Sequence, residues 1–249
     1  MMFARLPRPL RGLARGAAYV GALAGLMTMA ACSSPASRFY TLSDGGASAA
    51  SVASASAGAL VSARTSGAPA WLIEVAPIDV PPQVAKTQFV VQTGPTQVQV
   101  LEQERWASLP GDEIRRALST GLTQQLDTID VYGTAYPDSV PVYRVSVNVQ
   151  RFESWPGSHA LLDAVWSVRA VRSTAVMTCR GVVSEPVGGG YDALVSGHRL
   201  ALRQMSLQIA AGVKAMAASA TQGKASSASK GTVTAPAVPA CPSVVGTTG

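Results

Sequence analysis

The sequence predicts a layered, mixed α/β domain, because segments with two different hydrophobic periods follow one another along the chain. Three segments between residues 142 and 183 carry apolar side chains at every second position, the period of a half-buried β-strand. Residues 112–126 and 191–216 instead carry them every three or four positions, the period of an amphipathic helix. Strands and helices in one domain pack as layers around a common core.

Low-complexity segments set the limits of this domain. Residues 44–70 and 217–249 consist mainly of Gly, Ala, Ser, Thr and Val, with prolines added in the second stretch. Such segments bury too little apolar surface to offset the entropy lost on ordering the chain. We therefore expect a folded domain over residues 39–216, with a flexible insertion at 44–70 and a disordered tail at 217–249.

The first half of the domain predicts short strands and one helix. Arg38–Leu42 is an isolated strand candidate, and Trp71–Val75 is a second one, ended by the prolines that follow it. Residues 88–101 predict a hairpin, because two apolar runs flank a Gly-Pro turn. The helix predicted at 112–126 has acidic residues in its first turn, where the helix dipole favours them.

The second half predicts an antiparallel meander and a long helix. Val142–Phe152 alternates apolar and polar side chains, and two further strands are expected at residues 162–170 and 175–183. Three consecutive strands joined by tight turns form a meander. The second helix is expected from Tyr191 to Met216, with one apolar stripe along its length.

Residues 1–31 have the pattern of a secretory signal peptide. Four arginines and no acidic residue precede position 16, and an uncharged, largely apolar stretch follows from Gly16 to Ala31. That stretch has 16 residues, whereas a membrane-spanning helix needs roughly 20. A transmembrane anchor is therefore the weaker alternative.

Cys32 is the expected site of lipid attachment. It follows the small residues Ala30 and Ala31, which a lipoprotein signal peptidase accepts before its cysteine. A diacylglycerol on the thiol and a third acyl chain on the freed amine, palmitate among these chains, would give lasting attachment, since each buried CH₂ contributes about 0.8 kcal/mol. Ser33 in place of an aspartate favours the outer membrane. The alternative is a plain signal peptide with an incidental cysteine.

On this interpretation residues 32–38 are a lipidated tether that holds the domain at the periplasmic face. The formal charge of +6 includes four arginines of the signal peptide, so the mature chain has 20 − 4 = 16 basic against 14 acidic residues. A net charge of +2 without a basic cluster excludes an electrostatic case for nucleic-acid binding.

The residue types that carry enzyme chemistry lack the required spacing. The chain has two histidines, His159 and His198, and nothing resembling a nucleophile elbow frames any serine. No CxxC or HxxxH metal spacing is present, and Gly188–Gly190 lacks the Lys-Ser/Thr of a phosphate loop. Glu102 and Glu104 could form an acid/base pair, but we interpret them as solvent-exposed residues at the edge of a sheet. The sequence predicts no enzyme, no metal site and no cofactor.

Two cysteines, Cys179 and Cys241, remain besides Cys32. In an oxidising periplasm they are candidates for a disulfide. The alternative is that Cys179 is a buried strand thiol and that Cys241 is a free thiol of the tail.

Four short motifs follow one another between residues 32 and 216. They are Phe39–Leu42 (FYTL) shortly after the cysteine, Ile73–Pro81 (IEVAPIDVP), Glu104–Ala107 (ERWA) and Tyr191–Val195 (YDALV). In this order they resemble the ABC-type transport auxiliary lipoproteins, the YmbA/PqiC group. One departure is Pro82–Gln88 (PQVAKTQ), where that family often has Tyr-Leu-Asp-Arg-Pro-Gln.

The resemblance implies a three-layer α/β sandwich with a mixed, largely five-stranded sheet and two main helices, similar to the TolB amino-terminal domain. It also implies a non-enzymatic docking subunit at the outer membrane in an intermembrane lipid-transport system. The implied partners are membrane lipid through Cys32, a mammalian-cell-entry (MCE) domain protein, an ABC or permease-like component, and further copies of the chain in a ring.

A function of a different class competes with this one, namely an autonomous periplasmic ligand-binding lipoprotein. A neighbouring gene for an MCE-domain protein would favour the docking subunit. A monomer with a closed apolar pocket would favour the ligand-binding protein.

Overall fold

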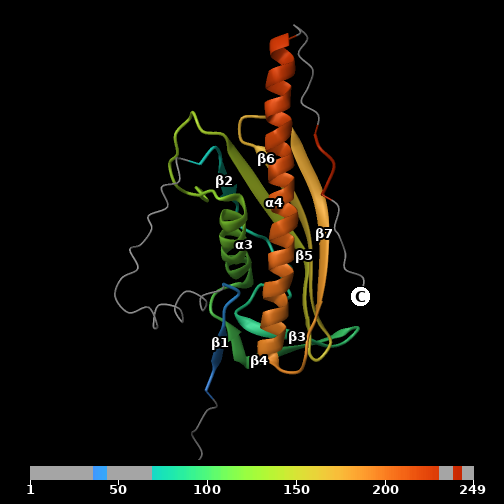
Figure 1. Cartoon of the computed structure of the whole chain (residues 1–249). Coiled ribbons are helices and arrows are strands. Elements are labelled where there is room, and N and C mark those ends of the chain that lie inside the picture. Colours follow the sequence, from blue (N-terminus) through green and yellow to red (C-terminus); the bar gives the residue numbers. More distant parts are fainter. Residues whose placement is uncertain (1–35, 44–68, 230–237, 243–249) are drawn as a thin grey trace, which may run out of the picture. The chain divides into compact units, whose positions relative to one another are not determined.

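A computed structural model describes residues 36–43, 69–229 and 238–242, and side chains within the last helix as far as Thr221. The elements lie in the compact unit Ser37–Gly249. The described residues contain seven strands and two helices (Figure 1). In chain order they are β1 (Arg38–Tyr40), β2 (Leu72–Val75), β3 (Gln88–Gly94), β4 (Gln97–Trp106), α3 (Pro110–Leu126), β5 (Val142–Trp155), β6 (His159–Ala170), β7 (Val176–Pro186) and α4 (Tyr191–Ser229).

The strands form two mixed sheets. The larger has the order β2-β5-β6-β7, in which β2 is parallel to β5 and the other neighbours are antiparallel. The smaller has the order β1-β4-β3, in which β1 is parallel to β4 and β3 is antiparallel to it. The mixed α/β class is confirmed, but the largely five-stranded sheet implied by the resemblance is not found. Prolines at 77, 81 and 82 lack the N–H that a ladder needs, so the chain leaves the larger sheet before β3 begins.

The meander is confirmed, with the face assignment that its alternation predicts. Val145 of β5 lies opposite Val168 of β6, which lies opposite Met177 of β7, and all three side chains are buried. Polar residues between them, such as Ser146 and Asn148, are exposed. Period-2 patterning therefore determines which face of the sheet forms the core.

The two helices pack side by side and cover one face of the larger sheet (Figure 1). Helix α4 lies so close to α3 and to the sheet that, at two glycines, any larger side chain would collide with a neighbouring residue. A Cβ on Gly121 of α3 would lie 2.7 Å from the Ser206 hydroxyl of α4, and a Cβ on Gly212 would lie 2.8 Å from the Trp166 ring. The predicted stripe of α4 is buried against this sheet: Leu194, Ala201, Met205, Ile209, Val213 and Met216.

Helix α4 continues beyond the residue at which the sequence predicts its end. It runs to Ser229 rather than Met216, so residues 217–229, expected in a disordered tail, are helical. Alanine has the highest helix propensity, and a helix already nucleated by packing extends through such residues at little cost. The expected insertion falls largely on residues 44–68, which lie outside the described residues. Within the described residues no helix is both long enough and apolar enough to cross a membrane.

Candidate functional site

Three of the four sequence motifs meet around one aromatic ring. Tyr40, Trp106 and Tyr191 lie with their ring centroids 5.8, 4.6 and 6.2 Å from that of Phe89. Aromatic pairs at these separations add to the stability gained by burial. The motifs thus mark the junction at which the smaller sheet packs against the start of α4.

Strand β1 joins this junction directly after the predicted tether. Its register places Arg38 opposite Glu104 and Tyr40 opposite Trp106. The Tyr40 hydroxyl donates a 2.6 Å hydrogen bond to the Glu104 carboxylate, and the backbone N–H of Ala107 donates to the Tyr40 carbonyl at 2.7 Å. The FYTL motif is therefore part of the folded domain.

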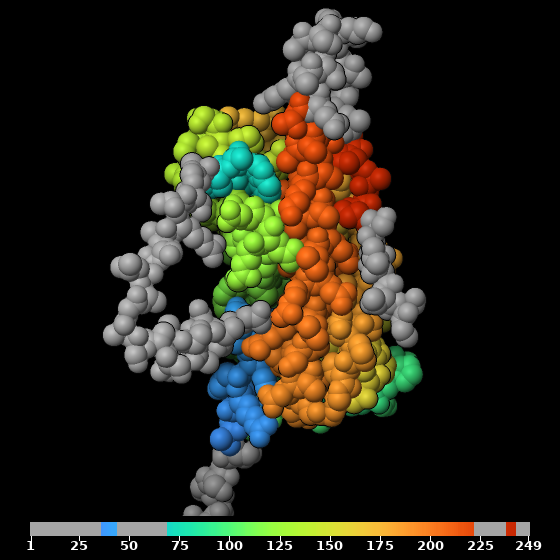
Figure 2. All heavy atoms as spheres, in the orientation of Figure 1, coloured from blue at the N-terminus to red at the C-terminus, as the bar shows by residue number. Residues whose placement is uncertain are grey.

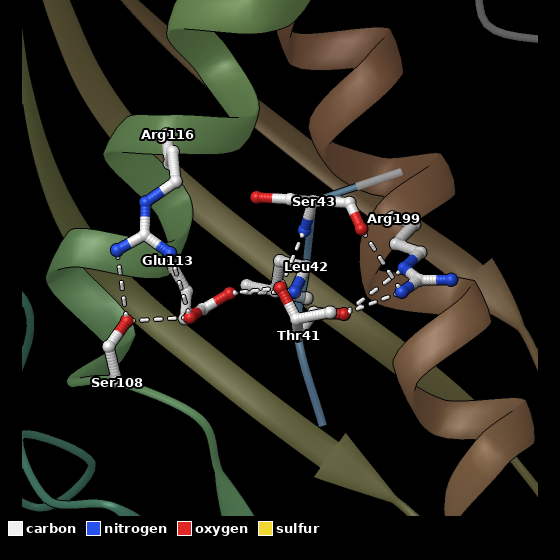
Figure 3. A network of polar contacts seen from close by, with 7 residues as sticks. All are labelled: Thr41, Leu42, Ser43, Ser108, Glu113, Arg116 and Arg199. Carbon is white, nitrogen blue, oxygen red and sulfur yellow. Dashed lines mark hydrogen bonds and ion pairs between the residues drawn. The ribbon is translucent and has the colours of Figure 1, made fainter. Parts of the chain in front are cut away.

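The residues that follow β1 are held by a buried carboxylate (Figure 3). Glu113, in the first turn of α3, is fully buried. It accepts hydrogen bonds from the Thr41 hydroxyl at 2.7 Å, the backbone N–H of Leu42 at 2.9 Å and the Ser108 hydroxyl at 2.6 Å. One carboxylate thus bonds two segments that are distant in the sequence.

Helix α4 holds the same segment from the other side (Figure 3). The Arg199 guanidinium donates hydrogen bonds to the carbonyl oxygens of Thr41 at 2.8 Å and Ser43 at 3.2 Å. We call this network the anchor clamp, consisting of Thr41, Leu42, Ser43, Ser108, Glu113, Arg116 and Arg199. It fixes the segment after β1 to both helices at once.

The electrostatics of the clamp keep Glu113 ionised. Burial acts to raise the pKa of its carboxyl, but the hydrogen bonds from Ser108, Thr41 and Leu42 and the charge of Arg116 lower it below its usual value. Arg116 Nη1 lies 3.3 Å from the carboxylate. Hydrogen bonds to an ionised acceptor are roughly twice as strong as neutral ones.

For Glu113 the sequence indicates only a favourable position at the helix dipole. It nevertheless contains a signal of burial, since Glu113, Ala117 and Gly121 are spaced by four and so share one helix face. Small residues on that face indicate a close helix neighbour. An acid in line with them is therefore a candidate for burial.

His198 of α4 is a buried core residue. Its Nε2 lies 2.8 Å from the Ser154 hydroxyl, and its ring stacks on Phe152 at 4.0 Å. Burial lowers the pKa of His198 to about 3, so the ring is neutral. Among the described side chains none pairs with its Nδ1. A serine-histidine pair is present, but it is buried, and no acid in the described part of the chain orients the imidazole.

The other chemical candidates from the sequence are not brought together. Glu104 accepts a hydrogen bond from Tyr40, while Glu102 forms an ion pair with Arg105 at 3.6 Å. His159 lies beside the Ser158 hydroxyl at the β5–β6 turn, and Gly188–Gly190 is the connection into α4. Among the residues with described side chains, no three His, Cys, Asp or Glu gather as metal ligands would.

The cysteines fall in two classes. Cys32 lies outside the described residues. Cys179, buried on β7, is joined by a disulfide to Cys241, 62 positions later. Because β7 is an edge strand, this bond holds residues 238–242 beside the margin of the larger sheet.

A cavity of about 660 Å³ lies at the end of the larger sheet away from β1. Its walls come from the starts of β2 and β5, the loop before β5, the β6–β7 turn, and residues 217–221 of α4. The side chains that line its interior are mostly Ala, Val, Trp and Tyr. No motif in the sequence predicts this cavity.

Residues 40–210 match the family model of the ABC-type transport auxiliary lipoprotein component. The chain belongs to this family. The match begins at Tyr40 and so covers the aromatic junction and the anchor clamp. It ends before Ala217–Thr221, the part of α4 that lines the cavity. As a member of the ABC-type transport auxiliary lipoproteins, the protein is a component of a transport system of the cell envelope.

A solved structure shows the same fold as this ABC-type transport auxiliary lipoprotein. It is the crystal structure of an uncharacterized protein, which aligns with 72% of this chain and 99% of its own, with a TM-score of 0.53 and 18% identity. A protein from Xanthomonas campestris aligns less closely, over 56% of this chain and 81% of its own, with a TM-score of 0.47 and 17% identity. No protein with a curated function is significantly similar in sequence.

Proposed function

We propose that this protein is an outer-membrane-anchored, non-enzymatic docking subunit of an intermembrane lipid-transport system, with an MCE-domain protein as its partner. Family membership supports the transport role. The signal peptide and the residues before Cys32 support a lipid anchor at the periplasmic face. The observation that carries the proposal is the short connection between this anchor and the clamped strand.

That connection limits how far the domain extends from the lipid. Arg38, the first residue of β1, is six positions after Cys32. At no more than about 3.5 Å per residue this connection spans about 20 Å. Because β1 and the anchor clamp hold the following segment to the domain, the domain stays close to the membrane surface. Such a position suits a subunit that ends a transport conduit better than a freely moving binding protein.

The surface supplies candidate contacts for a partner. Among the described residues, Val98 and Val100 on the β3–β4 hairpin are exposed, as are Leu200 and Leu207 on α4. Val98 and Val100 are two positions apart on one strand, and Leu200 and Leu207 are seven apart on one helix, so each pair shares a face. Apolar side chains that share an exposed face are candidates for a protein contact. By contrast, the serine-histidine pair lies in the core, where no substrate reaches it.

In-cell photo-crosslinking tests the docking role. A photoreactive amino acid at Val98 or at Leu207 should capture an MCE-domain protein or a second copy of this chain, identified by mass spectrometry. The same amino acid at Asn148, an exposed polar position, serves as the matched control. A protein that stays monomeric, captures neither partner and hydrolyses a lipid or a glycan would contradict the docking role.

The anchor has a separate test. Cys32→Ala should remove all metabolic palmitate label from the protein and release it from the membrane fraction, because the modified thiol is lost. Cys241→Ser, which removes a cysteine elsewhere, should keep the label. Palmitate retained on the Cys32→Ala protein would show that the lipid is attached at another residue.

The apolar cavity favours the alternative, an autonomous ligand-binding lipoprotein. The two functions differ in their dependence on a partner. Deleting the MCE-domain protein should abolish lipid transport by a docking subunit, whereas an autonomous binder should still load its ligand.

A further inference from the structure

We infer that the cavity at the end of the domain away from β1 binds the acyl chain of an amphiphilic lipid. This inference rests on the proposed lipid-transport function and names the part of the lipid that the subunit contacts. The volume of about 660 Å³ falls within the range of roughly 300–1,000 Å³ found for small-molecule pockets. Trp71, Tyr136 and Tyr143 supply aromatic walls, as such pockets commonly have.

The positions of the charged residues indicate that the part of the ligand inside the cavity is uncharged. Asp138 and Arg172 are the charged residues of the lining, and they pair with each other. Their side chains are 97% and 64% exposed, so the pair lies at the mouth. A charge placed deeper would lose its hydration without a partner. An apolar chain inside and a zwitterionic or polar head at the mouth therefore match the lining.

Tyr143 adds a hydrogen-bonding group near the aromatic wall. Its side chain is buried, its ring lies edge-on to Trp71 at 5.7 Å, and burial raises the pKa of its hydroxyl. A tyrosine hydroxyl can donate one hydrogen bond, and an aromatic ring with such a polar end suits a pocket that is apolar but needs a few polar contacts. An ester or carboxyl oxygen at the head of an acyl chain would accept this bond.

The fourth wall is the extension of α4 beyond its packed stripe. Met216 is the last buried residue of that stripe, and Ala217, Ala218 and Ala220 then line the cavity. Side chains of one carbon leave the space beside them open. The residues of this wall follow the region that matches the family model, residues 40–210. The family match therefore does not account for this wall.

The cavity lies far along α4 from the segment that follows the proposed anchor. From Tyr191, at the aromatic junction, to Thr221, at the cavity, α4 rises by 30 residues, or about 45 Å at 1.5 Å per residue. The tether reaches about 20 Å at most. The segment that follows the proposed anchor and the cavity therefore lie at opposite ends of α4, so a transport partner can contact the cavity end without displacing the clamped segment.

Photolabelling tests the inference on the mature, full-length lipoprotein in phosphatidylcholine vesicles. One arm adds donor vesicles that contain a phospholipid with a diazirine in one acyl chain, and the other adds free diazirine-containing palmitic acid. After illumination, labelled peptides are mapped by mass spectrometry. We expect label within Ser139–Tyr143 or Ala217–Thr221. Labelling in the phospholipid arm identifies a membrane lipid, and labelling with the fatty acid alone identifies a free acid; both support an acyl-chain site.

A matched pair of variants makes the test specific. Ala218→Trp fills the cavity and should reduce the label in these peptides at least tenfold. Ala211→Trp places the same side chain at an exposed position of α4 outside the cavity and should leave the label unchanged. Absence of label from both peptides in both arms, or label that Ala218→Trp does not reduce, would overturn the inference.

The same variants separate this inference from the docking role. If the protein captures its MCE-domain partner but takes no label, the docking role stands and the acyl-chain site is wrong. If it takes label but captures no partner, the site stands and the protein is an autonomous binder. If Ala218→Trp abolishes partner capture and the wild type takes no label, the cavity is a protein contact and the inference fails.

Discussion

Helix α4 meets opposite environments at its two ends. Near its start, Arg199, together with the Glu113 carboxylate of α3, binds the segment after β1 through short hydrogen bonds. Figure 2 shows this segment (blue) lying against the first part of α4 (orange). Near Thr221 the helix presents alanines to a cavity of about 660 Å³, which Trp71 and Tyr143 also line. Hydrogen bonds to buried groups stabilise a fold, whereas unfilled space is available to a ligand. The clamp end thus holds the segment after β1 to the domain, and the cavity end leaves room for a ligand.

The largest expected effect comes from removing the clamp carboxylate. Glu113→Ala should lower the free energy of unfolding by about 3 kcal/mol, because buried donors on Leu42, Thr41 and Ser108 lose their acceptor. Asp112→Ala, in the same turn but exposed, should change it by less than about 0.5 kcal/mol. Denaturant titration of both proteins measures the difference, and equal effects would show that the clamp adds nothing beyond the helix dipole.

Residues 238–242, which follow α4, are held to the domain by a disulfide and not by a hydrogen-bond network such as the clamp. Cys241→Ser should lower the free energy of unfolding by about 2 kcal/mol, since the Cys179–Cys241 bond closes a long loop in the unfolded chain. Reducing agent should destabilise the wild type by the same amount and leave the variant unchanged. Thiol titration of denatured, unreduced protein should find neither cysteine reactive; two reactive thiols would exclude the bond.

A third prediction concerns acid sensitivity near the clamp. The pKa of His198 is about 3 in the folded protein and 6.5 for an unperturbed histidine, so between these values the unfolded chain binds more protons. The stabilising effect is complete above pH 6.5 and is lost as pH falls, by about 2 kcal/mol between pH 7 and pH 5. His198→Phe should remove this slope while keeping the stack on Phe152. His159→Asn should keep the pH dependence. If His159→Asn removed it and His198→Phe kept it, the effect would belong to His159.

The smallest effect is expected at the cavity end. Ala218→Trp should change the free energy of unfolding by less than about 0.5 kcal/mol, because the cavity has room for the ring. The same substitution at Ala201, fully buried on the same helix, should cost about 1 to 3 kcal/mol through overpacking. Thermal unfolding of the two variants measures the contrast. A cost at Ala218 equal to that at Ala201 would mean that the cavity is filled in solution.

The local parts of this fold are predictable from the sequence. Alternation over Val142–Phe152 and the stripe of α4 depend on neighbours a few residues apart, and the structure confirms both. The number of strands in each sheet depends on where the chain goes after the prolines that follow β2. That is a non-local property, and the five-stranded sheet implied by the resemblance is not found.

The candidate sites divide in the same way. The motif residues Tyr40, Trp106 and Tyr191 are recognisable in the sequence, but their convergence on Phe89 requires the fold. Glu113 stands out in the sequence only as a helix-start acid, because its partners Thr41 and Leu42 lie about 70 positions away. The cavity is not predictable, since four separate segments form its walls and one of them belongs to a stretch that the sequence predicts to be disordered.

The parallel pairing of β1 with β4 would have a mechanical consequence for a chain that is anchored at Cys32, as proposed above. A tether that pulls on Arg38 applies its force along the strand, while the ladder hydrogen bonds run across it. These bonds are then loaded together in shear and are not opened one after another, as they would be in a strand peeled from its end. Beyond the strand, Glu113 and Arg199 bind the same segment. A sustained pull therefore has to break the ladder and the clamp before β1 detaches from the domain and the chain between β1 and β2 extends.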